Sequence, residues 1–257
     1  FKKNEKDKIK TSETFESKLT EINLKFGEIT SLEGKIGSGK SCFLKALTQY
    51  NDTTTVAKVV INDKEYKLDD FQTKISYSPQ DESFQTYDNI SCKEVLSGFS
   101  EDKLSDEYKE KLLSEIINGI CEKLPLLKKL FDIDGDIEEG MNIKNFLEKE
   151  YSSIHPSGGQ KGILTIIKHL FVVVAYNKKI LILDEVDKAI KDEDAKAVWK
   201  YLVEYVKKHK LHMIYVSHHK STYKFANQRI LFKVGEDPKV ESKNGDNYDG
   251  DDEKIDR

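Results

Sequence analysis

The stretch "GKIGSGKS" occupies residues 34–41 of the sequence. Glycines at these spacings let the backbone curl so that successive N–H groups point inward, toward the oxygens of a phosphate chain. In such a loop Lys40 reaches the outer phosphates and the Ser41 hydroxyl holds Mg²⁺. A chance match to this pattern arises in roughly one chain in a hundred of this length. The residues predicted to hold the phosphate chain are Gly34, Lys35, Ile36, Gly37, Ser38, Gly39, Lys40, Ser41 and Cys42.

The segments beside this loop predict a strand before it and a helix after it. "GEITSLEG" has the pattern of a turn and a strand, and "SCFLKALTQY" places Phe43, Leu44 and Leu47 at helical spacing. This is the context that phosphate binding requires, because the positive end of the helix then faces the anion. Further along, "VAKVVINDKEYKL" predicts a hairpin that turns at Asn62-Asp63, and "KISYSPQ" predicts a strand that runs into a loop.

An acidic pair follows a second predicted strand, in "KKILILDEVD". Four apolar residues form a buried strand, and Asp184 and Glu185 come at its carboxyl end, where ligands of open α/β sheets bind. Asp184 suits Mg²⁺, directly or through water, and Glu185 suits a general base. Without the glycine loop, a solvated turn would be the simpler interpretation of this pair.

The rest of the chain predicts a helical lobe and a mainly parallel sheet. From about Asp88 to Ile154 the pattern is helical, and from Ile163 helices alternate with strands such as "ILIL" and "HMIYVS". That alternation is typical of an α/β fold with a mainly parallel sheet. The apolar stripe of the predicted lobe consists of Leu112, Leu113, Ile116, Ile117 and Ile120.

A third stretch, "PSGGQKG" at residues 156–162, precedes an apolar helix. Ser-Gly-Gly-Gln at a helix start is another anion cradle, in which glycines permit close backbone approach and a serine donates a hydrogen bond. The order and spacing of the three stretches resemble those of the ABC ATPases, from about Ile22 to Val234. The signature residues that this resemblance identifies are Ser157, Gly158, Gly159 and Gln160.

The same resemblance assigns three further residues. Gln80 in "SYSPQDESF" corresponds to the glutamine loop, and His218 in "IYVSHH" to the switch histidine. Phe15 is the candidate for the aromatic residue that stacks on adenine. The family fold implies a P-loop NTPase (RecA-like) core, a small antiparallel β subdomain and a helical signature subdomain. We expect one domain over residues 1–240, with the helical subdomain at about 85–158, and an acidic, disordered tail over 241–257.

The resemblance also implies a mechanism, in which two cassettes pair head to tail around Mg-ATP and hydrolyse it. The segments "KISYSPQDESFQTYDNIS" and "FANQRILFKVGE" resemble exporters of the multidrug-resistance type. They imply an attached transmembrane domain and a place on the cytosolic face of a membrane. Each ATP site would combine Ser157–Gln160 of one copy with Lys40, Ser41, Gln80, Asp184, Glu185 and His218 of the other, with Mg²⁺ near Ser41, Gln80 and Asp184.

Two departures from the family pattern leave a second function open. Pro156 stands where the family usually has leucine, and Lys191 stands where aspartate is expected, with Asp192 one place later. A soluble or regulatory ABC ATPase with weak or no hydrolysis is therefore the alternative to a transporter cassette.

The composition of the chain excludes few classes of protein. The net charge of −4 over 257 residues gives no reason to expect a nucleic-acid partner, and the three cysteines lack metal-ligand spacing, which suits a reducing compartment. The most apolar stretch, Ile163 to Tyr176, is shorter than the ~20 residues of a membrane span. The chain starts at Phe1 without a signal-peptide pattern, so we expect a piece of a longer protein.

Overall fold

The central element of the fold is a six-stranded sheet in the order β5-β6-β7-β2-β8-β9. A computed structural model describes residues 23–48, 59–80, 82, 89–98, 104–131 and 139–243. Neighbouring strands are parallel except for the pair β8 and β9, as the alternation of strands and helices predicts. The strands are β2 (Ile29–Gly34), β5 (Ile75–Ser78), β6 (Ile180–Asp184), β7 (His212–Val216), β8 (Gln228–Phe232) and β9 (Lys239–Ser242).

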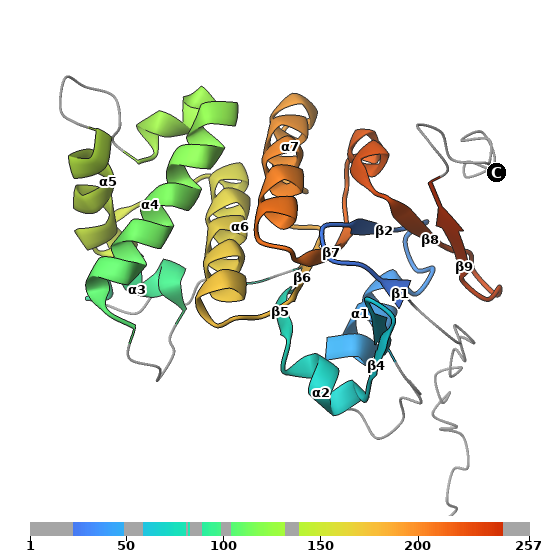
Figure 1. The fold of residues 1–257 in the computed structure, drawn as a ribbon. Helices are drawn as coiled ribbons and strands as arrows, with labels where there is room; N and C mark the ends of the chain where they lie inside the picture. The colour runs from blue at the N-terminus through green and yellow to red at the C-terminus, as the bar shows by residue number, and fades with distance from the viewer. Residues whose placement is uncertain are drawn as a thin grey trace, which may run out of the picture.

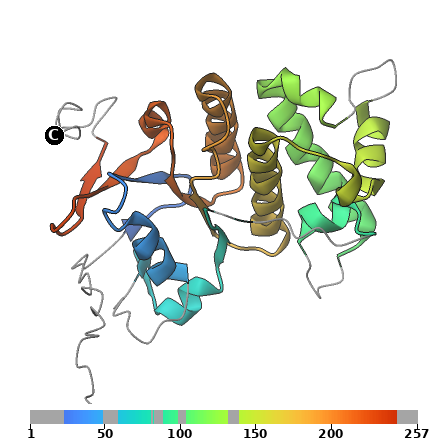
Figure 2. The ribbon, with the colours of Figure 1, turned by 180° about the vertical axis from the view of Figure 1, so that it is seen from behind.

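Helices cover both faces of this sheet (Figures 1 and 2). In β6, Ile180 and Ile182 pack into one apolar cluster with α1 (Lys40–Thr48), whereas Leu181 and Leu183 pack into the other. That second cluster contains α6 (Gly158–Ala175) and α7 (Asp192–Lys208). A strand buried on both faces reads as a continuous apolar run, which is why "ILIL" shows no alternation with polar residues. The helix after the glycine loop and the helix after the signature therefore lie on opposite faces of the sheet.

A small second sheet has the order β1-β3-β4. Its hairpin turns at Asn62 and Asp63, as predicted, and both residues have positive φ (47° and 60°), which a tight two-residue turn requires. The β3 and β4 strands are antiparallel, but β1 pairs with β3 in parallel, so this sheet is mixed rather than purely antiparallel. Its elements and the next helix are β1 (Asn23–Leu24), β3 (Val59–Ile61), β4 (Lys64–Tyr66) and α2 (Leu68–Gln72).

The helical lobe forms at the edge of the molecule beyond α6 (Figure 1). The predicted apolar stripe lies on α4 and is buried, and it belongs to the same apolar cluster as α6 and α7. Phe131 and Phe146 close the interior of the lobe with ring centroids 4.9 Å apart in an edge-to-face contact. The elements of the lobe are α3 (Cys92–Ser97), α4 (Asp106–Lys123), η1 (Pro125–Lys129), α5 (Glu139–Glu148) and η2 (Tyr151–Ser153).

The carboxyl-terminal part of the described chain consists of η3 (Lys220–Phe225) and the β8–β9 pair. β9 spans the predicted domain boundary at residue 240, and the residues after 243 lie outside the described residues. In the part of the chain that the structure describes, α6 alone has the length and apolarity of a membrane-crossing helix. It packs against the sheet and the lobe, so burial in the core explains its apolar composition.

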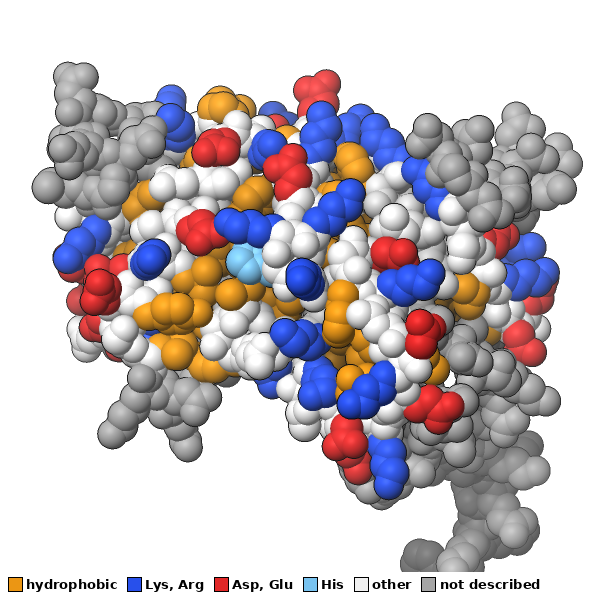
Figure 3. Space-filling model, in the orientation of Figure 1, with side chains coloured by type: hydrophobic (Ala, Val, Ile, Leu, Met, Phe, Trp, Pro, Cys, Tyr) orange, Lys and Arg blue, Asp and Glu red, His pale blue; other side chains and the backbone are white. Residues whose placement is uncertain are grey.

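Charges are mixed on the face seen in Figure 3, where basic and acidic side chains are interspersed. Apolar side chains gather on that face over the region of the helical lobe. The charged side chains of that view do not form a patch of one sign.

Candidate functional site

The glycine loop connects β2 to α1, in the predicted context. Gly37 has φ 81°, a left-handed conformation that glycine adopts without steric cost. Gly34 is needed for a different reason, because a side chain there would collide with the backbone oxygen of Phe232. The Lys40 ammonium folds back onto the loop and donates hydrogen bonds to the carbonyl oxygens of Gly34 (2.7 Å) and Lys35 (3.0 Å). A phosphate chain in this loop would offer Lys40 stronger, charged acceptors.

Opposing effects act on the charge of Lys40. Its side chain is 9% exposed, and burial lowers its pKa, whereas the nearby carboxylates of Glu185 and Asp184 act to raise it. Burial penalises the charged form of an amine, and neighbouring anions favour it. The loop therefore holds a partly desolvated cation next to the acidic strand end, as recognition of a triphosphate requires.

Asp184 ends β6 and is 1% exposed. Burial raises its pKa, and the charge of Glu185 adds to that effect, while a hydrogen bond with Ser41 and the charges of Lys40 and Lys45 oppose it. One carboxylate oxygen, Oδ1, is buried without a hydrogen-bond partner. A buried polar atom without a partner is costly unless something else binds there.

These features fit a Mg²⁺ site. The hydroxyl of Ser41 and the unpartnered oxygen of Asp184 are hard ligands of the kind that Mg²⁺ takes. Within the described residues no group of three or more His, Cys, Asp or Glu side chains could hold a metal alone. Mg²⁺ usually takes one or two protein ligands, and phosphates and water complete its shell.

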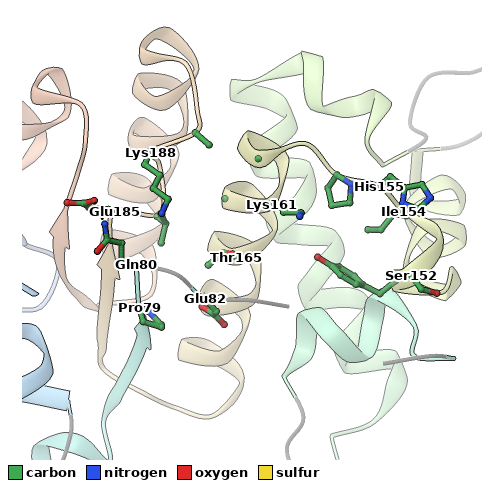
Figure 4. A pocket seen from close by; sticks show the side chains of 16 residues that line it. Pro79, Gln80, Glu82, Ser152, Ile154, His155, Lys161, Thr165, Glu185 and Lys188 are labelled. Atoms are coloured by element: carbon green, nitrogen blue, oxygen red, sulfur yellow. Dashed lines mark hydrogen bonds between the residues drawn. The ribbon is translucent and has the colours of Figure 1, made fainter. Parts of the chain in front are cut away.

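Glu185 follows β6 with φ 52°, in the left-handed region. This conformation is strained for a residue other than glycine and costs on the order of 1–3 kcal/mol. The Glu185 N–H donates to the carbonyl oxygen of Val216 at 2.9 Å, which ties the turn to the end of β7. The side chain of Glu185 is half-buried and lies beside Gln80 (Figure 4).

Gln80, in the loop after β5, donates from Nε2 to Oε2 of Glu185 at 2.7 Å (Figure 4). The sequence predicts that Gln80 lies near Ser41 and Asp184, the other expected Mg²⁺ ligands. The structure brings it to the expected edge of the sheet, and there its partner is Glu185.

His218 leaves the same edge of the sheet as the acidic pair, because Asp184 and Val216 are paired in the register of β6 and β7. Its side chain is exposed, and its ring lies edge-on to that of His219 with centroids 5.9 Å apart. Its backbone N–H donates to Oδ1 of Asp187 at 3.2 Å.

The signature residues begin α6. Ser157 is the N-cap: its hydroxyl oxygen accepts from the N–H of Gln160 (3.3 Å), and the Gln160 side chain accepts from the N–H of Ser157 (2.8 Å). This capping box satisfies two backbone donors at the helix start. A side chain at Gly159 would lie 2.8 Å from the carbonyl oxygen of Ala189. The glycines therefore allow α6 to pack closely against the segment after Glu185. This helix lies on the sheet face opposite α1.

The residues that depart from the family pattern also have defined places. Lys191 precedes α7 as its N-cap without a side-chain capping bond. Asp192 accepts a hydrogen bond from the hydroxyl of Ser221 at 2.5 Å and pairs with Lys196, so it is bound within this chain.

Near the glycine loop, Ile36 is 97% exposed and Cys42 is an exposed free thiol. Phe15 lies outside the described residues.

A cavity of about 860 Å³ extends from the glutamine loop and the acidic turn to the chain before α6 (Figure 4). Gln80 and Glu185 line one side of it, while His155 and Lys161 lie on the other (Figure 4), and Pro156 also belongs to its lining. The cavity thus extends from the acidic turn to the start of α6, where Gly158 of the signature also lines it.

Glu82 is a half-buried acid that the sequence gives no reason to select. Its carboxylate accepts from Ser78 (3.0 Å) and from Lys168 (2.6 Å), and its other partner is Nε2 of His169 (2.6 Å). Burial acts to raise its pKa, but the hydrogen bonds and charges of His169 and Lys168 outweigh burial and lower it to about 2. The cluster fastens the chain just after Gln80 to the middle of α6.

A family model described as "ABC transporter" matches residues 18–188 of the chain. Multidrug resistance protein 1 of Plasmodium falciparum is 26% identical over 235 residues, which cover 80% of this chain and 16% of that protein. The energy-coupling factor transporter ATP-binding protein EcfA2 of Clostridium acetobutylicum is 26% identical over 201 residues, which cover 77% of this chain and 62% of the relative. The chain thus spans less than two thirds of either relative's length.

The fold is also similar to that of solved structures. An ATP-binding cassette, solved as a dimer in a post-hydrolysis state with ADP and Pi, superposes with a TM-score of 0.59 at 20% identity. The match covers 87% of this chain and 89% of that one. At 20% sequence identity, this structural similarity establishes the fold alone.

Proposed function

This chain belongs to the ABC transporter family, whose cassettes hydrolyse ATP, and from that premise we propose that it binds and hydrolyses Mg-ATP in a head-to-tail dimer to drive transport through an attached transmembrane domain. The observation that carries the proposal is the edge of the sheet at which Lys40, Asp184 and Glu185 converge. A phosphate-binding cation, a metal ligand and a base meet there, which are the parts that phosphoryl transfer requires.

Binding starts at the glycine loop. The phosphate chain takes the place of the two carbonyl oxygens that Lys40 contacts, and the N-terminal end of α1 faces the anion. Ser41 and Asp184 would hold Mg²⁺, which supplies positive charge that offsets the developing charge on the phosphates.

Hydrolysis needs a base for the attacking water. Glu185 fits this role because its backbone is held by the bond to β7 and its carboxylate is held by Gln80. His218, at the same edge, would contact the γ-phosphate, as the family resemblance implies.

The dimer follows from the separation of the two phosphate-binding motifs. The glycine loop opens onto α1 and the signature begins α6, on opposite faces of the sheet. One chain therefore offers each nucleotide a single motif, and a second copy in head-to-tail order supplies the other. The dimeric cassette with a similar fold supports this arrangement.

Transport is the proposed output, at the cytosolic face of a membrane. It is supported by the multidrug resistance relative and by the exporter-like segments of the sequence. Closure around ATP would move Gln80, and the Glu82 cluster would carry that movement to α6 and the lobe beside it.

The regulatory alternative is favoured by one observation: Asp192, the acid displaced by Lys191, is bound within its own chain. Steady-state ATP hydrolysis by the protein, with Glu185→Gln as the blank, separates the two functions. Turnover that depends on Glu185 and on protein concentration supports the hydrolysing dimer. ATP binding without turnover above the Glu185→Gln blank supports the regulatory module.

A further inference from the structure

Asp187 is a buried acid close to the base, and the mechanism above does not use it. It is 1% exposed and lies two positions after Glu185. Its Oδ2 accepts hydrogen bonds from Nε1 of Trp199 (3.0 Å) and from the hydroxyl of Ser217 (2.5 Å). Its Oδ1 accepts from the backbone N–H of His218 (3.2 Å). Both oxygens of one carboxylate are therefore used, and two of the three donors belong to the loop after β7.

The same loop is tied to Asp187 a second time. The Nε2 of His219 lies 3.1 Å from the Asp187 carbonyl oxygen, and because a carbonyl can only accept, the ring is assigned as the donor. The hydroxyl of Ser217 also accepts from the N–H of His219 at 2.9 Å. Residues 217–219 are thus held by the side chain and the backbone of a single residue.

We propose that Asp187 is a positioning residue for ATP hydrolysis, which fixes residues 217–219 so that the His218 ring stands at the same edge as Glu185. The inference rests on the proposed function, in which His218 contacts the γ-phosphate. The ring of His218 is exposed, so its backbone anchor decides where it stands. Hydrogen bonds to a buried carboxylate are the stronger kind, and losing one leaves a buried donor unsatisfied.

The chemistry of the anchor explains why an acid is needed. A carboxylate accepts on both oxygens, whereas the isosteric amide of asparagine accepts on one side and donates on the other. With Asp187→Asn, the amide nitrogen faces either the His218 N–H or the Trp199 N–H, and both of these can only donate. One of these two hydrogen bonds is lost without a change of shape.

The test is a double-mutant cycle with Asp187→Asn and His218→Ala, measured as steady-state hydrolysis and as ATP affinity. We expect Asp187→Asn to lower kcat roughly 10-fold and to leave the Kd for ATP within about 2-fold, since the glycine loop is untouched. In the His218→Ala background, Asp187→Asn should lower kcat by less than about 2-fold, because the residue through which it acts is gone.

Asp106→Asn is the control. It makes the same acid-to-amide change on the helical lobe, where the partners of Asp106 are Lys93 and Lys109, so residues 217–219 keep their contacts. We expect its kcat to stay within about 2-fold of the parent.

The results distinguish a failure of the positioning role of Asp187 from a failure of the proposed role of His218. The positioning role is overturned if the losses of kcat from Asp187→Asn and His218→Ala multiply in the double mutant. It is also overturned if Asp187→Asn keeps the parent's kcat. A His218→Ala protein that hydrolyses ATP at the parental rate overturns the role of His218 in the proposed function instead. If Asp187→Asn does not fold, Ser217→Ala removes one donor and keeps the carboxylate. A parental kcat for Ser217→Ala then overturns the inference, and a loss that disappears in the His218→Ala background supports it.

Discussion

The Nε2 of Gln80 lies 2.7 Å from Oε2 of Glu185, which joins two residues 105 positions apart in the chain. Glu185 is also held by its backbone bond to Val216 and has a left-handed conformation. A carboxylate oriented through one oxygen can present the other to a water molecule. The strain at Glu185 and its contact with Gln80 together set the direction of the Glu185 carboxylate, which we propose as the base.

Gln80→Ala should lower kcat more than it weakens ATP binding, by roughly 10-fold against about 2-fold, because the base loses its orienting donor. Gln80→Glu should lower kcat further, since two carboxylates would then face each other. Steady-state hydrolysis and equilibrium nucleotide titration measure both effects. A Gln80→Ala enzyme with the parent's kcat would show that the contact has no role in turnover.

Glu185→Gln should lower turnover by roughly 10²–10⁴-fold, the usual scale for the loss of a positioned base, and leave ATP binding largely intact. Phosphate release from a dimerised preparation is the measurement. Glu204→Gln makes the same change at an exposed acid on α7 and should keep the parental rate. Undiminished hydrolysis by Glu185→Gln would exclude Glu185 as the base.

Lys40→Ala should weaken ATP binding, because the phosphate chain loses its buried point-charge partner. Lys64→Ala removes an exposed lysine from β4 and serves as the control for the loss of one positive charge. Titration of Mg-ATP against the three proteins compares their affinities. Equal affinity for the parent and Lys40→Ala contradicts the assignment of the glycine loop.

Glu185→Gln protein should accumulate as an ATP-bound dimer, because the change relieves repulsion near the γ-phosphate and blocks the hydrolysis that separates the copies. Ser157→Arg in that background should abolish the dimer and preserve monomeric ATP binding, since a bulky cation would occupy the anion cradle. Light scattering with and without ATP reports the assembly state.

The control for this experiment is Ser105→Arg, at the N-cap of α4. It loses the same kind of cap, worth about 1 kcal/mol, and adds the same charge away from the signature. Ser105→Arg should still dimerise. Dimerisation of Ser157→Arg to the same extent as its parent contradicts a site shared between copies.

Acid should remove the stabilisation that Glu82 provides. Its pKa in the folded protein is lowered to about 2, so the folded state binds fewer protons than the unfolded state. The stabilisation is present above the ordinary pKa of a glutamate, about 4.3, and is lost as the pH falls from there through about 2. The difference in unfolding free energy between the parent and Glu82→Gln should therefore shrink below pH ~4.3 in denaturant titrations. A difference that is constant from pH 7 to pH 3 would contradict the ionised cluster.

The elements that the sequence predicts well are those whose causes lie within a few neighbouring residues. The glycine loop, the hairpin at Asn62-Asp63 and the helix start at Ser157 each depend on local backbone conformations and side-chain bonds. The strand before Asp184 was predictable for the same reason, because four successive apolar residues indicate burial on both faces. The antiparallel pair β3–β4 was predictable from its turn, whereas the parallel pairing of β1 with β3 was not, since it depends on partners distant in sequence.

The sequence by itself thus determined the phosphate-binding motifs, their order and the α/β class, because each motif needs particular residue types at short, regular spacings. Only the tertiary structure decided which side chains meet: Gln80 with Glu185, Glu82 with Lys168 and His169, and Asp187 with the loop of His218. These contacts arise where β5, β6 and β7 end side by side, and their register sets them. No spacing within the chain encodes that register, because it results from burying apolar residues from the whole sequence on both faces of one sheet.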